Sequence, residues 1–216
     1  MKIKYQIRNI VFQPLTEILK EDKGRVLVHF WQVLQLRQLR QLMALLVISD
    51  IIKMEKFKSF DSTVMPLNIE NIDTDQIIPA RFLKATTRDG FGDNLFRDWR
   101  YDSDNKLIEE FELNKIKNNS KILLAGRNFG CGSSREHAAW AIYDYGFRVV
   151  ISSFFADIFK NNALNNGLLV IKLEDKVIDG IFKKVSGDEN TLFHVDLESQ
   201  TFNSLNGEIY EKFDIN

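Results

Sequence analysis

Short apolar runs separated by mixed polar and apolar stretches organise the chain from about residue 60 onward. Residues 121–125, 147–152 and 168–173 are short apolar runs, the second of them rich in β-branched residues, which predicts buried strands. Residues 133–145, 154–164 and 177–185 are expected to be helices, and Gly146 and Gly167 are natural stops for the first two. Further strands are expected at 191–197 and 208–213, the second of them preceded by an Asn206-Gly207 turn.

This alternation of strands and helices predicts the fold class. Apolar strands that alternate with helices are typical of an α/β fold, in which a largely parallel central sheet is flanked by helices through right-handed crossovers. No internal repeat or low-complexity tract interrupts the pattern.

Residues 1–53 differ in composition from the rest of the chain. The stretch 31–48 is rich in Leu, Gln and Arg, and apolar residues follow helical spacing within it: Leu36, Leu39, Met43 and Leu46. The stretch is either a partner-binding helix or an extension ahead of a true start at Met54. We therefore expect an atypical N-terminal extension over 1–53, helical or poorly ordered, and one folded domain over 54–216.

Charge and cysteine usage narrow the class of protein. The formal net charge is -1, so no strong attraction to nucleic acid or to an anionic membrane is expected. The most apolar run, residues 43–52, is too short to span a bilayer, and no secretory signal is recognisable. The single cysteine, Cys131, fits a reducing cytoplasm and cannot supply a disulfide, a zinc site or an iron–sulfur site by itself. A soluble, cytoplasmic protein is expected.

The most informative stretch, residues 125–140, joins a strand to a helix through the glycine-rich loop 126–132. The free amides and dipole at such a helix start favour an anion. Gly130 and Gly132 would let the backbone approach a ligand, and Arg135 offers a fork suited to a carboxylate or phosphate. Neither a dinucleotide-binding fingerprint nor a Walker loop is present, so a carboxylate is the favoured anion.

The same residues allow a purely structural interpretation. Ser133 and Glu136 have the Ser-x-x-Glu spacing of a capping box, which begins many helices that have no chemistry. The two interpretations are compatible, because a serine at a helix start lies where its oxygen would be stabilised if ionised. His137 is either an acid–base group or a structural hydrogen-bonding residue.

A second polar cluster lies at residues 71–79. Asp73 and Asp75 indicate a metal site or a turn, and the turn is the more frequent use of two acids with so few further oxygen ligands. No metal site is assigned. The cations that follow, Arg81, Lys84 and Arg88, form either an anion-binding loop or a solvated basic surface, and the pattern leaves both open.

Taken together, these segments resemble the isopropylmalate dehydratase small subunits of the aconitase superfamily, over about residues 54–214. The core Gly-Ser-Ser-Arg-Glu-His, residues 132–137, is specific to the superfamily, and Cys131 ahead of it points to the isopropylmalate branch. The segments that carry the resemblance are 73–79, 87–92, 95–100, 128–138, 144–147 and 153–159.

The resemblance implies a swivelling β/β/α domain of the aconitase type that closes over a large subunit carrying a 4Fe-4S cluster. It implies reversible conversion of 2-isopropylmalate to 3-isopropylmalate in leucine biosynthesis, by a heterodimer that is active only when both subunits are present. Ser133 resembles the catalytic base, and Ser134, Arg135 and Arg88 resemble binders of the small dicarboxylate substrate. The expected supporting residues are Gly130, Gly132, Glu136, His137, Asp73 and Asp75.

Two features depart from the family pattern. Residues 1–53 have no counterpart in it, and the domain 54–216 ends earlier than is usual in bacterial relatives. Two other functions stay open. One is the small subunit of a related, homoaconitase-like hydro-lyase, a choice expected to be set by residues 81–96. The other is a degenerate, non-catalytic subunit that binds a partner through the N-terminal helix.

Overall fold

The computed structural model describes residue 41 and residues 57–83, 90–115, 120–133 and 135–215. Contacts divide the chain into two units, Met1–Met54 and Glu55–Asn216. The helix predicted within 31–48 lies outside the described residues, apart from position 41.

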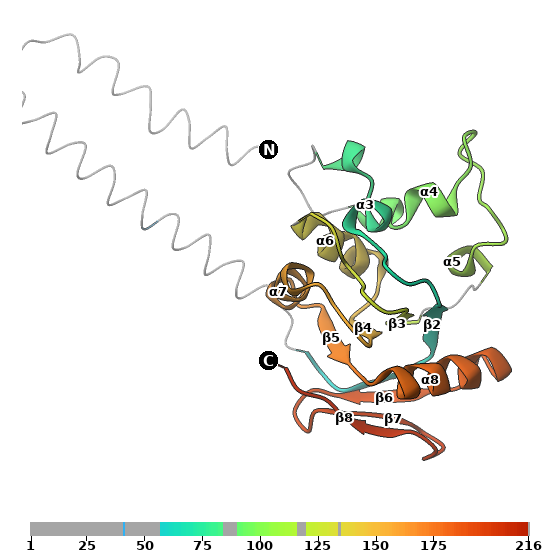
Figure 1. The fold of residues 1–216 in the computed structure, drawn as a ribbon, viewed down its shortest axis with the longest axis vertical. Coiled ribbons are helices and arrows are strands. Elements are labelled where there is room, and N and C mark those ends of the chain that lie inside the picture. Colours follow the sequence, from blue (N-terminus) through green and yellow to red (C-terminus); the bar gives the residue numbers. More distant parts are fainter. Residues whose placement is uncertain (1–40, 42–56, 84–89, 116–119, 134, 216) are drawn as a thin grey trace, which may run out of the picture. The chain divides into compact units, whose positions relative to one another are not determined.

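A four-stranded parallel sheet forms the centre of the second unit (Figure 1). It consists of β2 (Val64–Leu67), β3 (Ile122–Ala125), β4 (Val149–Ser152) and β5 (Leu169–Lys172), side by side in that order. Every residue of β3 and β4 is buried, as expected of parallel strands covered on both faces. The three apolar runs predicted to be buried strands are therefore confirmed as β3, β4 and β5.

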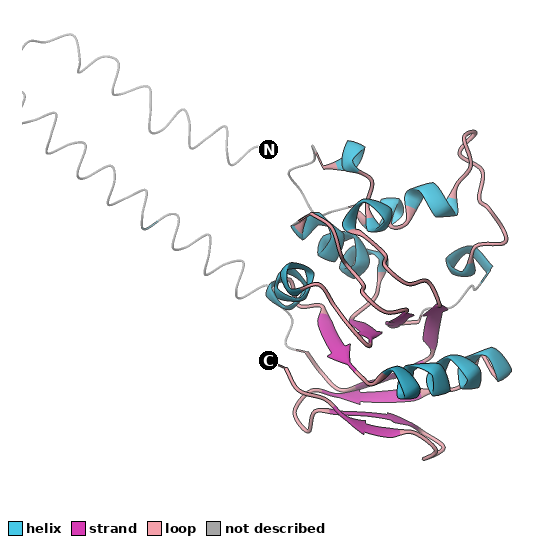
Figure 2. Cartoon of the chain, in the orientation of Figure 1, coloured by secondary structure: helices cyan, strands magenta, loops and turns pink. Residues whose placement is uncertain are grey.

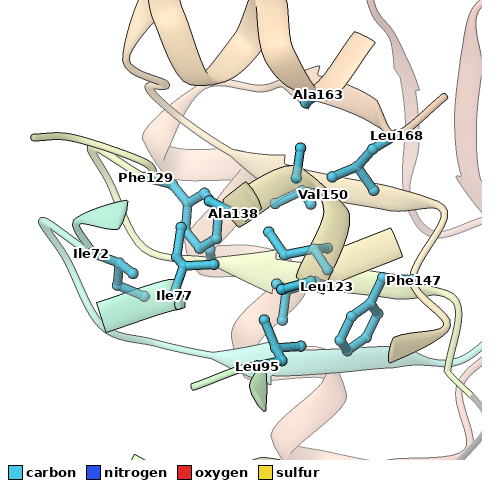
Figure 3. Packing of buried hydrophobic residues seen from close by; sticks show 14 of the residues in the cluster. Ile72, Ile77, Leu95, Leu123, Phe129, Ala138, Phe147, Val150, Ala163 and Leu168 are labelled. Carbon is cyan, nitrogen blue, oxygen red and sulfur yellow. The ribbon is translucent and has the colours of Figure 1, made fainter. Parts of the chain in front are cut away.

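Two of the three longer helices cross between these strands. α6 (Glu136–Tyr145) links β3 to β4 and α7 (Asp157–Asn165) links β4 to β5, while α8 (Asp175–Gly187) follows β5. Successive residues of a strand point to opposite faces. Accordingly Leu123 and Val150 pack with Ala138 and Ala163 of α6 and α7 (Figure 3), whereas the alternate strand residues pack against α8 and the second sheet.

The second sheet is antiparallel and lies beside α8 (Figure 2). It contains β1 (Phe60–Ser62), β6 (Phe193–Asp196), β7 (Thr201–Ser204) and β8 (Tyr210–Lys212), in the order β1-β6-β7-β8. Alternate residues of β6 are buried, so one face packs on the core and the other faces solvent. The expected β/β/α domain with a parallel central sheet is thus confirmed, but the sequence pattern did not separate this antiparallel sheet from the central one.

In its described residues, the long connection between β2 and β3 carries short elements: α3 (Thr74–Ile77), η1 (Ala80–Phe82), η2 (Gly92–Asn94), α4 (Arg97–Arg100) and α5 (Glu112–Lys115). Ile77, Leu95 and Phe96 from this connection are fully buried in the cluster that contains α6. The connection therefore packs against the helix that follows the glycine loop. Within the described part of the chain, no helix is long and apolar enough to cross a membrane.

Candidate functional site

The glycine-rich loop 126–133 leaves the carboxyl end of β3 and lies along that edge of the parallel sheet. The loop after β2 and the loop after β4 flank it, each through backbone contacts. Open α/β sheets bind their ligands outside the carboxyl ends of the strands. The loop that the sequence singled out therefore lies where this class of fold builds small-molecule sites.

Hydrogen bonds between the loops continue the β2–β3 pairing beyond both strands. Asn71 N donates to Arg127 O at 2.8 Å, and Gly130 N donates to Ile72 O at 2.7 Å. Asn71 and Asn128 both have left-handed backbones, with φ of 57° and 63°, a conformation that asparagine tolerates well. Nδ2 of Asn128 donates to Oδ1 of Asn71 at 2.9 Å. Backbone and side chains thus hold this flank of the loop in one place.

The opposite flank is held by the segment that follows β4. Phe129 N donates to Phe154 O at 3.0 Å, and Ala156 N donates to Phe129 O at 3.1 Å. Gly130 has φ of +75°, and a β-carbon there would lie 2.2 Å from Cγ of Phe159. Only glycine fits this contact, so the backbone of the loop packs directly on α7.

The helix after the loop begins later than the sequence predicts. Its first residue is Glu136, preceded by Arg135 in an extended conformation (φ -132°, ψ 108°) with no side-chain cap. The predicted capping box between Ser133 and Glu136 is therefore wrong. Oε1 of Glu136 accepts a hydrogen bond of 3.0 Å from Nδ2 of Asn166. The carboxylate is therefore bound by a buried side-chain amide at the end of α7.

Ser133 is exposed, yet its backbone is anchored. Its carbonyl oxygen accepts a hydrogen bond of 2.9 Å from Oγ1 of Thr74, which is only 2 % exposed. Gly132, just before it, has φ of +90° and would place a β-carbon 3.4 Å from Cβ of Asp73. Thr74 was not predicted as part of the site, because its contact joins positions 59 residues apart.

Arg135 and Asp75 bring the two predicted polar clusters together. Nη1 of Arg135 donates to Oδ1 of Asp75 in an ion pair. The side chain of Arg135 is 19 % exposed and that of Asp75 is 53 % exposed. An ion pair this open to solvent adds little stability, so its main consequence is the direction in which the guanidinium points.

Asp73 has a local role as the N-cap of α3. Its Oδ1 accepts from Gln76 N at 2.7 Å, and its own N–H donates to Oε1 of Gln76 at 2.8 Å, which completes a capping box. Burial raises the pKa of the neighbouring Cys131 thiol, and the charge of Asp73 raises it further. The thiol therefore stays protonated at neutral pH, and its Sγ lies 3.4 Å from Asn71 O, to which it donates.

His137 lies in an aromatic cluster at the start of α6. Its ring centroid is 4.5 Å from that of Trp140 and 5.5 Å from that of Phe91. Of the two interpretations that the sequence left open, this packing accounts for a histidine at this position without any chemistry.

The basic residues of the earlier loop are only partly described. Arg81 forms a two-pronged pair with Asp98, with Nη1 to Oδ2 at 3.0 Å and Nη2 to Oδ1. These hydrogen bonds lower the pKa of Asp98 and raise that of Arg81. Arg81 is thus engaged by a carboxylate of its own chain. Lys84, Arg88 and Ser134 lie outside the described residues.

The described residues hold no metal-ligand cluster at this loop, and one cavity lies elsewhere on the folded unit. Among the described residues, no group of three or more His, Cys, Asp or Glu side chains could hold a metal ion. A cavity of about 490 Å³ lies between residues 66–69, 110–112 and the end of α8. None of the predicted site residues lines this cavity.

Comparisons with known proteins agree with this geometry. The family model described as the aconitase C-terminal domain matches residues 54–176. A 3-isopropylmalate dehydratase small subunit from Azobacteroides pseudotrichonymphae is 60% identical over 164 residues, which cover 76% of this chain and 83% of the relative. Its counterpart from Karelsulcia muelleri is 65% identical over 147 residues, covering 68% of this chain and 75% of the relative.

A solved structure supports the same likeness. The crystal structure of a 3-isopropylmalate dehydratase from Methanocaldococcus jannaschii superposes with a TM-score of 0.54 at 25% sequence identity. The match covers 73% of this chain and 82% of that chain. The similarity therefore extends over most of the folded unit in sequence and in fold.

Proposed function

The chain belongs to the aconitase C-terminal domain family, among the 3-isopropylmalate dehydratase small subunits, and from this membership we propose that loop 126–133 and Arg135 form its half of the dehydratase active site. The function is that of a hydro-lyase component in leucine biosynthesis. The observation that carries the assignment to this loop is the anchored, exposed Ser133, two residues from the paired guanidinium of Arg135.

The chemistry requires a base and support for negative charge. Dehydration of isopropylmalate removes a proton from the carbon next to a carboxylate and a hydroxide from the neighbouring carbon; rehydration returns them with the positions exchanged. We assign the proton transfer to Ser133, which takes the proton as an alkoxide and returns it as a hydroxyl. The negative charge that develops on the substrate must be stabilised by fixed positive groups.

Ser133 needs help to act as a base, because a free hydroxyl holds its proton tightly. The positive end of the α6 dipole and the charge of Arg135 both favour an ionised oxygen nearby. The raised pKa of the Cys131 thiol keeps that neighbour neutral, so it adds no competing negative charge. These features favour Ser133 over Cys131 as the proton acceptor.

Arg135 is suited to a substrate carboxylate. Its pairing with Asp75 engages Nη1, and the guanidinium fork carries further N–H groups that match the two oxygens of a carboxylate. In this proposal Asp75 sets the direction of the fork. The family resemblance adds Ser134 and Arg88 as further carboxylate binders, and both roles are proposals about residues outside the described part of the chain.

The proposal requires a large-subunit partner that carries the 4Fe-4S cluster. Such clusters are held by several cysteine thiolates, and this chain has one cysteine. A cluster on the partner would act as the Lewis acid for the leaving hydroxyl. The residues of this chain would bind the carboxylates, move the proton and exclude water. A cytoplasmic location, where thiolates and the cluster stay reduced, belongs to the same proposal.

An isomerisation assay tests this function. 2-Isopropylmalate is supplied to three samples, and formation of 3-isopropylmalate is followed in each. The samples are this chain, a candidate large subunit with its cluster, and an equimolar mixture of the two. We expect turnover in the mixture alone, because each chain carries half of the reacting groups. Turnover by this chain without a partner, or an inactive mixture in which the two chains demonstrably associate, would contradict the proposal.

Replacing Arg135 with lysine is expected to weaken substrate binding in the assembled enzyme. A point charge cannot reproduce the two-pronged contact, and loss of one charge-assisted hydrogen bond costs roughly a ten- to hundredfold factor in kcat/KM. The expected change is mainly in KM, measured by steady-state kinetics. Arg97→Lys is the matched control, because Arg97 donates to Asn105 and lies over the Tyr101 ring instead. Unchanged kinetics of the Arg135 variant would remove this role.

A further inference from the structure

We propose that Asn166 is a positioning residue: it fixes the first turn of α6 and thereby the direction in which Arg135 presents its guanidinium. The inference rests on the proposed function of Arg135 as a carboxylate binder. It concerns a residue with no motif around it, at the carboxyl end of α7.

The side-chain amide of Asn166 is buried and makes three hydrogen bonds. Its Nδ2 donates to Oε1 of Glu136 at 3.0 Å and to the carbonyl oxygen of Asn162 at 2.7 Å. Its Oδ1 accepts from Nε1 of Trp140 at 2.9 Å. The residue is 7 % exposed, so each lost partner would leave a buried polar group unsatisfied.

These contacts hold α6 at two points on one face. Glu136 is the first residue of the helix and Trp140 lies four residues later, one turn along the same face. One amide therefore fixes both the rotation of α6 about its axis and the place where it begins. The bond to Asn162 ties that amide to α7, whose Phe159 packs against the glycine loop.

The Asn166 contact acts on a helix start whose N-cap residue makes no side-chain hydrogen bond to the helix. Arg135 occupies the N-cap position in an extended conformation without a side-chain hydrogen bond to the helix. A free helix start frays and reorients. Since Arg135 directly precedes the tethered Glu136, a change at Asn166 is transmitted to the guanidinium through a single peptide unit.

Only an amide satisfies this arrangement, because the position needs two N–H donors and one acceptor. Asn166→Asp keeps the size and the acceptor for Trp140. It places a carboxylate oxygen against the carboxylate of Glu136 and the carbonyl of Asn162. The resulting repulsion acts on the first turn of α6. The substitution does not alter the sequence of the glycine loop.

The test uses the complex reconstituted with the large subunit. Asn166→Asp is expected to lower kcat/KM for 2-isopropylmalate by about ten- to a hundredfold, chiefly by raising KM, because small misplacements of binding groups have effects of this size. The double variant with Glu136→Gln is expected to recover most of the loss, since the glutamine amide can donate to the new carboxylate. Glu136→Gln alone is measured as the reference for the double variant, because its carbonyl oxygen still accepts from Asn166.

Asn114→Asp is the matched control. Asn114 also uses both donors and its acceptor, with Nδ2 to the carbonyls of Arg100 and Ile108 and Oδ1 from Nε of Arg100. Its contacts lie between α4 and α5, away from the start of α6. This variant is expected to lose thermal stability while keeping its KM. The contrast separates positioning of Arg135 from general destabilisation.

The outcomes are distinct. An inactive wild-type mixture counts against the proposed function and not specifically against Asn166. With an active wild-type enzyme, an unchanged KM in Asn166→Asp overturns the inference, as does a double variant that is no better than the single one. If Asn166→Asp does not assemble, Asn166→Ser takes its place, because it removes both contacts to α6 without adding charge; a normal KM in that variant overturns the inference equally.

Discussion

Ser133→Ala is expected to reduce turnover of the assembled enzyme by about a hundred- to ten-thousandfold, the contribution typical of a positioned acid–base group. Ser133 is exposed, and the contact that anchors it uses its backbone carbonyl, which alanine retains. The fold should therefore tolerate the change, with a free energy of unfolding within about 0.5 kcal/mol of the wild type. Steady-state kinetics and thermal unfolding measure the two quantities.

The control for this variant is Ser186→Ala, which removes an exposed hydroxyl from α8. It is expected to leave turnover unchanged. Substrate affinity is the second readout for Ser133→Ala: loss of a base lowers kcat, whereas loss of a binding contact raises KM. Turnover near the wild-type value in Ser133→Ala would exclude Ser133 as the proton acceptor.

Gly130→Ala is expected to produce the largest loss of stability. Its φ of +75° is unfavourable for alanine, and the added β-carbon would lie 2.2 Å from Cγ of Phe159. Phe159 is 2 % exposed and packs edge-on against Phe129 with ring centroids 5.2 Å apart, so its ring has little room to move. Strain and overpacking together cost on the order of 3 kcal/mol, which lowers Tm by roughly 10 °C for a domain of this size.

Gly180→Ala is expected to raise the stability of the protein. Gly180 lies inside α8, and a β-carbon there meets nothing within 4 Å. Alanine at an exposed position inside a helix stabilises the protein by about 0.5–1 kcal/mol relative to glycine. Differential scanning calorimetry of both variants compares them directly. Equal Tm values for Gly130→Ala and the wild type would show that the loop does not pack on Phe159 as described.

Three of the four strands of the central sheet and the longer helices follow from the sequence pattern, whereas β2 (Val64–Leu67) was not predicted. β3, β4 and β5 are short apolar runs bounded by turn residues, and α7 and α8 lie close to their predicted positions. β1 and β7 were not predicted, because neither is a continuous apolar run and each owes its place to pairing with β6. The described elements between β2 and β3 are short and have no period to detect.

The candidate site was foreseeable as a stretch of sequence but not as a set of contacts. The glycine loop and Arg135 stand out by residue type, while the partners that hold them come from far along the chain. Thr74 lies 59 residues from Ser133, and Asn166 lies 30 residues from Glu136. The predicted capping box was wrong because Arg135, and not Ser133, is the N-cap of α6, and the carboxylate of Glu136 accepts a hydrogen bond from Asn166 at the end of α7.

The most direct measurement is a structure of the two-subunit enzyme with a bound isopropylmalate analogue. We expect Oγ of Ser133 to lie within about 3.5 Å of the carbon that loses its proton, with the fork of Arg135 on a substrate carboxylate. A ligand held entirely by the partner, with loop 126–133 facing solvent, would contradict this expectation.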